Sequence, residues 1–230
     1  MNPMLRQFVH VHWKNARWPL VPFVAAGFAF PFTALRWSVS AAERAVYSPA
    51  LDAIAAMQTW IFVFPIMAAL LGGTMALTAW SWDHRANHVY ALSLPLTRTR
   101  YTALKLAAGA LLLLLPVVAA WAGALLGTLT IDVPDGLRAY PNAFAVRLLL
   151  GALICYAVVF ALAAGTMKTA VYIITGFLLF LIFGSLVVGV MEELTGRSDL
   201  WTPIQIVHTA LSEWPGPFHV FGGNWMLLDV

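Results

Sequence analysis

Long apolar runs separated by short polar stretches dominate this sequence. The windows that contain no Lys, Arg, Asp or Glu are 18–35, 53–82, 106–131, 148–167 and 169–191. Each window reaches or approaches the roughly 20 residues that a helix needs to cross about 30 Å of hydrocarbon. Backbone groups in hydrocarbon must bond internally, and these runs are too continuous for the alternating strands of a barrel. The pattern therefore predicts five membrane-spanning helices, over 18–36, 56–80, 104–130, 145–166 and 169–191.

The two ends of the chain have a different pattern. Residues 1–17 have apolar positions at helical spacing on one face and basic positions on another, which predicts an amphipathic helix in the membrane interface. The alternative is a frayed terminal tail. The interfacial residues are Arg6, Phe8, Trp13, Lys14 and Arg17. Residues 192–230 are interrupted by prolines and by "FGGNW", which predicts an extracytoplasmic, partly re-entrant segment rather than a sixth span.

The composition agrees with a membrane protein. The chain is 61% hydrophobic and 10% charged, whereas soluble domains are about 45–50% apolar and about 25% charged. A soluble fold could not hide so much apolar surface. We therefore expect a single all-α, multi-pass domain in the cell (inner) membrane. Glycine pairs within the spans, Gly72–Gly73, Gly123/Gly127 and Gly184/Gly189, indicate close helix packing.

The charges predict an orientation. If the N-terminus is cytoplasmic, eight Lys/Arg fall inside and five outside, and Asp83 is the only acid on the inside. An excess of Lys and Arg in cytoplasmic segments is typical of membrane proteins. The basic balance is therefore explained by anionic lipid headgroups, and no nucleic-acid partner is expected.

Catalytic and cofactor motifs are missing from the sequence. It has no Walker-type glycine-rich motif, and its single cysteine excludes a disulfide or a cysteine metal cluster. His84 and His88 are four residues apart, but zinc needs three or four protein ligands and no third lies nearby. The spans contain almost no ionisable residue, unlike those of proton-coupled carriers. We expect no enzyme activity, no cofactor and no metal in this chain, and a transport role would draw its energy from elsewhere.

The polar segment 83–100 separates the second and third spans. A short cytoplasmic helix is expected over 83–92, Pro95 would end it, and Thr97 or Thr99 would cap the next helix. An exposed helix of this kind is suited to docking a protein partner; the alternative is a loop that only anchors to lipid. The predicted partner-contacting residues are Asp83, His84, Arg85, Asn87, His88, Tyr90, Leu92, Pro95 and Arg98.

The order "WDHRANHVYALSLPLTRTRYTALK" resembles the first cytoplasmic loop of type-2 ABC transporter permeases (ABC-2 type). In that family an acid near the end of the second span precedes a short coupling helix, an "SLP" element follows, and a lysine opens the third span. The matching residues are Asp83, Ser93, Leu94, Pro95, Leu96, Thr97, Arg98 and Lys105. The chain departs from the family in having Asp83 where glutamate is commoner and in lacking a recognisable sixth span.

The resemblance implies a non-catalytic permease subunit. Two permeases would pair, as a homodimer or a heterodimer, and separate ATP-binding subunits holding ATP and Mg²⁺ would dock at the coupling helix. Export of a lipid-like, polymeric or amphipathic substrate is the family's usual direction. Two other functions stay open on the residues alone: a structural or assembly subunit of another membrane complex, and a membrane subunit that binds a cofactor.

Overall fold

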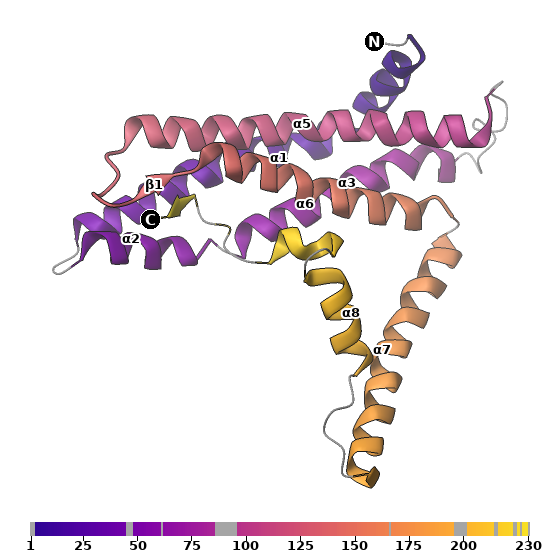
Figure 1. Cartoon of the computed structure of the whole chain (residues 1–230). Coiled ribbons are helices and arrows are strands. Elements are labelled where there is room, and N and C mark those ends of the chain that lie inside the picture. Colours follow the sequence, from indigo (N-terminus) through magenta and orange to yellow (C-terminus); the bar gives the residue numbers. More distant parts are fainter. Residues whose placement is uncertain are drawn as a thin grey trace. The chain divides into compact units, whose positions relative to one another are not determined.

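Helices make up most of the chain (Figure 1). The structure is a computed structural model that describes residues 3–44, 48–60, 62–85, 96–165, 167–195, 202–213, 216–222, 225 and 227–229. Among the described residues, five helical stretches are long and apolar enough to cross a membrane: Pro3–Glu43, Pro49–Arg85, Arg98–Thr130, Pro141–Ala163 and Thr175–Thr195. The chain thus has the architecture of a multi-pass membrane protein, as the apolar windows predict.

Two compact units divide the chain, one formed by residues 1–160 with 224–230 and the other by 161–223. The helices of the first unit are α1 (Pro3–Glu43), α2 (Pro49–Gln58), α3 (Val63–Arg85), α5 (Arg98–Thr130) and most of α6 (Pro141–Ala163). This unit also contains the strands β1 (Arg138–Ala139) and β2 (Leu228–Asp229). The second unit contains α7 (Met167–Thr195), α8 (Pro203–Ser212) and the 3₁₀ helix η1 (Pro217–Phe221).

Helices α1 and α5 lie side by side and run in the same direction (Figure 1). The ring of Phe8 on α1 contacts that of Tyr101 near the start of α5. Further along, glycines allow the backbones to approach: a Cβ atom on Gly123 of α5 would collide with the carbonyl group of Phe28 on α1. Small residues at such crossings let the two backbones touch directly, which is common where membrane helices pack.

Helices α3 and α6 form a second parallel pair. The rings of Phe64 on α3 and Phe144 on α6 are 4.7 Å apart, and the indole Nε1–H of Trp80 donates to the carbonyl oxygen of Phe160 at 3.1 Å. Between these contacts, Gly72 packs directly on the α6 backbone. Because the end of α3 also meets the start of α5, this pair runs opposite to α1 and α5. Successive long helices of the unit therefore alternate in direction.

The alternation gives the first unit two distinct ends. The loop end comprises the start of α1, the end of α3, the start of α5 and the end of α6. The strand end comprises the end of α1, α2, the start of α3, the end of α5, β1 and the start of α6. Here Ala42, Ala53 and Leu137 form a small buried cluster.

The strand end is closed by the C-terminal segment. Strands β1 and β2 pair antiparallel, with Arg138 opposite Asp229 and Ala139 opposite Leu228. The backbone N–H of Tyr140 adds a bond of 2.8 Å to the carbonyl oxygen of Leu227. Trp225, Leu227 and Leu228 are buried. The sequence pattern predicts none of this pairing, because two-residue strands have no periodicity to recognise.

In the second unit, α8 packs against α7, with Pro203 lying on Gly184. Helix α8 begins with a capping box: the Thr202 hydroxyl accepts from the N–H of Gln205, and the Gln205 side chain accepts from the N–H of Thr202. With 10 residues, α8 is about 15 Å long and too short to cross a membrane. Within the described part of α7, no side chain of the apolar stretch is buried and most are exposed.

Several predicted boundaries differ in the structure. The predicted interfacial helix 1–17 and the first span form one continuous helix, α1, which accommodates Pro19, Pro22 and Pro31. The second predicted span is preceded by a separate short helix, α2, and begins at Val63. Helix α5 begins at Arg98, six residues before the predicted span, because Thr97 caps it there. Residues 86–95, which include most of the predicted coupling helix, lie outside the described residues.

Candidate functional site

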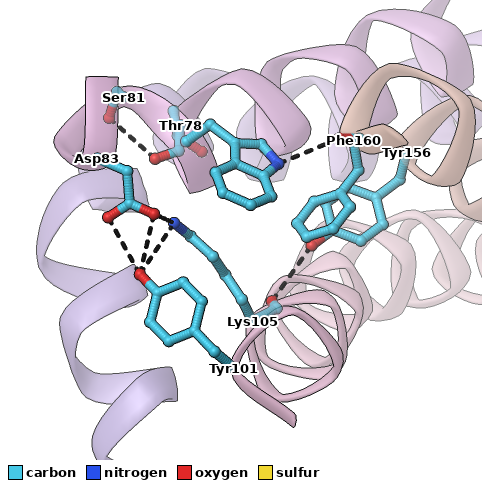
Figure 2. A network of polar contacts seen from close by, with 8 residues as sticks. Thr78, Ser81, Asp83, Tyr101, Lys105, Tyr156 and Phe160 are labelled. Carbon is cyan, nitrogen blue, oxygen red and sulfur yellow. Dashed lines mark hydrogen bonds and ion pairs between the residues drawn. The ribbon is translucent and has the colours of Figure 1, made fainter. Parts of the chain in front are cut away.

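A buried ion pair connects the two helices that flank the polar loop. Asp83 in the last turn of α3 is 1% exposed, and Lys105 on α5 is 5% exposed. The Lys105 ammonium donates to Asp83 Oδ2, and the Tyr101 hydroxyl lies 3.0 and 2.9 Å from the two carboxylate oxygens (Figure 2). Burying two charges is unfavourable unless they are paired and their remaining bonding groups are satisfied. The Asp83 carboxylate meets both conditions, because it is paired with Lys105 and also bonded to Tyr101.

Helical spacing brings these side chains together. Tyr101 and Lys105 are four residues apart on α5 and therefore share one face. Trp80 lies three residues before Asp83 on α3, and its ring centroid is 4.1 Å from the Lys105 ammonium. A cation over an indole face is attracted by the ring quadrupole. We call Trp80, Asp83, Tyr101 and Lys105 the loop brace.

Helix α6 supports the loop brace from a third direction. The Tyr156 hydroxyl donates to the carbonyl oxygen of Leu106 at 3.2 Å, which fixes α6 against α5. Trp80 bonds to the backbone of α6 through Phe160, as described above. Tyr156 and Phe160 lie with their ring centroids 5.5 Å apart on consecutive turns (Figure 2). The loop brace is thus anchored to α3, α5 and α6 together.

The N-terminal part of α1 covers the remaining side. Phe8 meets Tyr101 edge-on, with ring centroids 5.4 Å apart and an interplanar angle of 70°. One turn later His12 is 5% exposed, and its ring is within electrostatic range of Lys105 and Asp83. Its Nε2 atom is buried without a hydrogen-bond partner in the described part of the chain. The segment predicted to lie in the membrane interface therefore also packs on the loop brace.

The structure distributes the predicted interfacial residues over two faces of α1. Phe8 is half-buried against Tyr101, whereas Arg6, Lys14 and Arg17 are exposed. Trp13, predicted to share the apolar face with Phe8, is 42% exposed. His12 occupies the buried face instead, because it lies four residues after Phe8 whereas Trp13 lies five after it.

The predicted partner-contacting residues are divided in the same way. Arg85 and Arg98 are exposed on either side of the loop, and His84 is half-buried near Trp80. Asp83 lies in the interior, where Lys105 and Tyr101 occupy its carboxylate, so it holds the start of the loop rather than presenting a surface contact. The remaining predicted residues lie outside the described residues: Asn87, His88, Tyr90, Leu92 and Pro95.

Sequence reasoning did not select Trp80, Tyr101 or His12 as site residues, and it matched Lys105 to the family's loop pattern without pairing it with Asp83. The spacings Trp-x-x-Asp before the loop and Tyr-x-x-x-Lys after it indicate one helix face each, and an acid and a base at opposite loop ends could have suggested the pair. No group of three or more His, Cys, Asp or Glu residues that could hold a metal ion is found among the described residues. What the site offers is mechanical: a buried, hydrogen-bonded junction between α3 and α5.

Exposed charges differ at the two ends of the first unit. At the loop end the exposed charged residues within the described part are all basic: Arg6, Lys14, Arg17, Arg85, Arg98 and Arg100. At the strand end both signs of charge are exposed in the described part, and acids are the more numerous. The exposed arginines are Arg36, Arg44 and Arg138, and the exposed acids are Glu43, Asp52, Asp132, Asp135 and Asp229. The loop brace contributes to this difference because it removes Asp83 from the surface.

Comparison with known proteins gave no match to a protein-family model, to a curated protein or to a solved structure.

Proposed function

We propose that this chain is the permease subunit of an ATP-driven ABC exporter of the ABC-2 type. It would form half of the translocation pathway with a second permease subunit and receive its energy from a separate ATP-binding subunit docked at 83–100. The observation that carries the proposal is the buried loop brace beneath a loop whose sequence resembles the family's coupling loop.

A docking loop transmits force only if its ends are fixed to the helices that must move. The loop brace supplies that fixation, because Asp83 belongs to α3 and Tyr101 and Lys105 belong to α5. A displacement of the loop would therefore move both helices as one body. Packed side chains, hydrogen bonds and rigid helices are the elements that carry such coupling between two places.

The distribution of charge supports an external energy source. The windows 106–131 and 169–191 have no charged residue, and Asp83 and Lys105 neutralise each other at one end of their helices. Carriers driven by protons or ions usually place ionisable groups within the membrane. The basic loop end also fits a cytoplasmic location, where nucleotide is present.

The test is purification of the tagged chain from its native membrane, followed by measurement of ATP hydrolysis in the purified assembly. We expect a hydrolysing partner to be recovered, and Arg85→Glu to reduce its retention and the ATP hydrolysis of the assembly at least about tenfold, as loss of a central charged contact commonly does. The matched control is Arg36→Glu, an exposed arginine at the strand end, which should leave both unchanged.

Two results would overturn the proposal. One is recovery of stable partners none of which hydrolyses ATP, which would favour an assembly subunit of another complex. The other is full partner retention and full ATP hydrolysis after deletion of residues 84–92.

A further inference from the structure

Six exposed basic residues lie at the loop end of the first unit. Phe8 contacts Tyr101, so Arg6 of α1 is at the same end of the unit as Arg98 and Arg100 in the first turn of α5. Arg85 follows Asp83 by two residues, and Asp83 bonds to the same Tyr101. Lys14 and Arg17 follow the buried His12 by two and five residues on α1. We call this set the basic rim: Arg6, Lys14, Arg17, Arg85, Arg98 and Arg100.

The α1 part of the basic rim has the features of a lipid-facing surface. Trp13 is 42% and Trp18 73% exposed, and the Arg17 guanidinium lies 5.6 Å from the centroid of a Trp18 ring. The same helix continues directly into an apolar stretch long enough to cross a membrane. Tryptophan, lysine and arginine at the edge of such a stretch lie at the level of the lipid headgroups.

The positive charge of the basic rim indicates which kind of lipid it would bind. No exposed acid accompanies the basic rim in the described part of the loop end, because Lys105 and Tyr101 bind the carboxylate of Asp83 in the interior. Clustered Lys and Arg beside a membrane helix attract anionic headgroups, and the attraction increases with each added charge. At the strand end, acids outnumber arginines on the surface, so no such attraction is expected there.

We propose that the basic rim is a binding surface for anionic phospholipids, with Arg6, Lys14 and Arg17 of α1 as the residues that contact phosphate-bearing headgroups. The inference is independent of the proposed transport function, because it requires neither ATP nor a partner subunit. It assigns α1 two roles through opposite faces: the buried face carries Phe8 and His12 onto the loop brace, and the exposed face binds lipid.

The test uses the full chain alone, reconstituted in nanodiscs of phosphatidylcholine mixed with phosphatidylglycerol. Native mass spectrometry after release in mild detergent counts the lipids of each kind that stay bound. We expect enrichment of phosphatidylglycerol on the wild-type chain and a loss of about tenfold or more in Arg6→Gln/Lys14→Gln/Arg17→Gln. The matched control Arg36→Gln/Arg44→Gln/Arg138→Gln removes the same charge from the strand end and should keep the enrichment.

Equal retention of phosphatidylglycerol by the two triple variants would overturn the proposal, and so would a wild-type chain that shows no preference between the two lipids. Size-exclusion chromatography verifies that each variant is folded. If the rim variant does not fold, Lys14→Gln/Arg17→Gln replaces it and must show a partial loss. Absence of lipid enrichment combined with rim-dependent, salt-sensitive binding of an ATP-binding subunit would assign the surface to a protein partner and refute lipid binding.

Discussion

At the scale of single residues, Asp83 and Lys105 depend on each other. Each is a charged group removed from water, and each is stabilised by the other and by Tyr101. Removing one member of a buried pair leaves an uncompensated charge, whereas replacing both members with neutral groups of similar volume is often tolerated. The free energy of unfolding should therefore fall much more when one member of the pair is replaced than when both are replaced.

We predict that Lys105→Met lowers the free energy of unfolding by about 3–5 kcal/mol, because Asp83 is left charged and unpaired in the interior. The double variant Asp83→Asn/Lys105→Met should recover most of that loss. Denaturant unfolding of the purified chain in detergent micelles measures both, with Arg98→Met as an exposed control expected within about 0.5 kcal/mol of wild type. Equal losses in the single and double variants would show that the pair does not stabilise the fold.

The Tyr101 hydroxyl can be tested separately from its ring. Tyr101→Phe keeps the edge-on contact with Phe8 but removes the hydrogen bond to the carboxylate, so we expect a loss of about 1.5–3 kcal/mol in the same unfolding measurement. Tyr140→Phe, at an exposed position of the strand end, is the control and should be neutral. A neutral Tyr101→Phe would mean that the hydroxyl contributes nothing to holding Asp83.

The sequence identified Asp83 as the one acid on the predicted inner side, and Lys105 as the lysine that opens the third span, but it did not pair them. The two residues are 22 positions apart on different helices. Their meeting depends on how α3 and α5 are aligned lengthwise, which apolar periodicity does not determine. His12 was not selected because nothing in the sequence marks it as buried: histidine is intermediate between the buried and exposed residue types.

At the scale of elements, glycines determine which helices approach closely. Gly72 and Gly73 are equivalent in the sequence pattern, but only Gly72 faces a neighbouring helix. A Cβ on Gly72 would overlap the α6 backbone at Ala152 and Tyr156, whereas nothing lies within 4 Å of one on Gly73. Gly184 and Gly189 differ in the same way. The composition of a span predicts close packing, but only the rotation of the helix decides which glycine takes part.

Gly72→Ala should therefore destabilise the protein, whereas Gly73→Ala should not. The first forces α3 and α6 apart and should cost about 1–3 kcal/mol of unfolding free energy, as overpacking typically does. The second meets open space and should be neutral or stabilising by up to about 1 kcal/mol, because alanine favours a helix over glycine. Thermal unfolding of the two variants in the same detergent compares them, and equal effects would contradict the α3–α6 packing.

At the scale of the whole molecule, the alternation of helix direction follows from the five predicted spans, and the contacts within the first unit agree with it. The sequence could predict this because each apolar run is long enough to cross once and each polar stretch must lie on one side or the other. It could not predict which segment closes the strand end, because β1 and β2 are separated by some ninety residues and are too short to produce a pattern.

The alternation predicts that Arg98 and Arg138 lie on opposite sides of the membrane. In a Cys155→Ser background, Arg98→Cys and Arg138→Cys each provide one exposed thiol. A membrane-impermeant maleimide should label Arg138→Cys in right-side-out vesicles and Arg98→Cys only in inverted vesicles, if the N-terminus is cytoplasmic. Labelling of both from the same side would refute the alternation itself, and a reversal of the two results would refute only the orientation.

The pairing of β2 with β1 also constrains how the protein is made. A ribosome delivers α1 to α6 to the membrane before it has translated Trp225 and Leu228, which complete the same compact unit. Until then the inserted helices lack these buried side chains, because α7 and α8 are translated between α6 and β2. The first unit can therefore complete its fold only after residues 224–230 have been translated. A nascent chain stalled within α8 would contain every helix of that unit but would lack β2, the strand that pairs with β1.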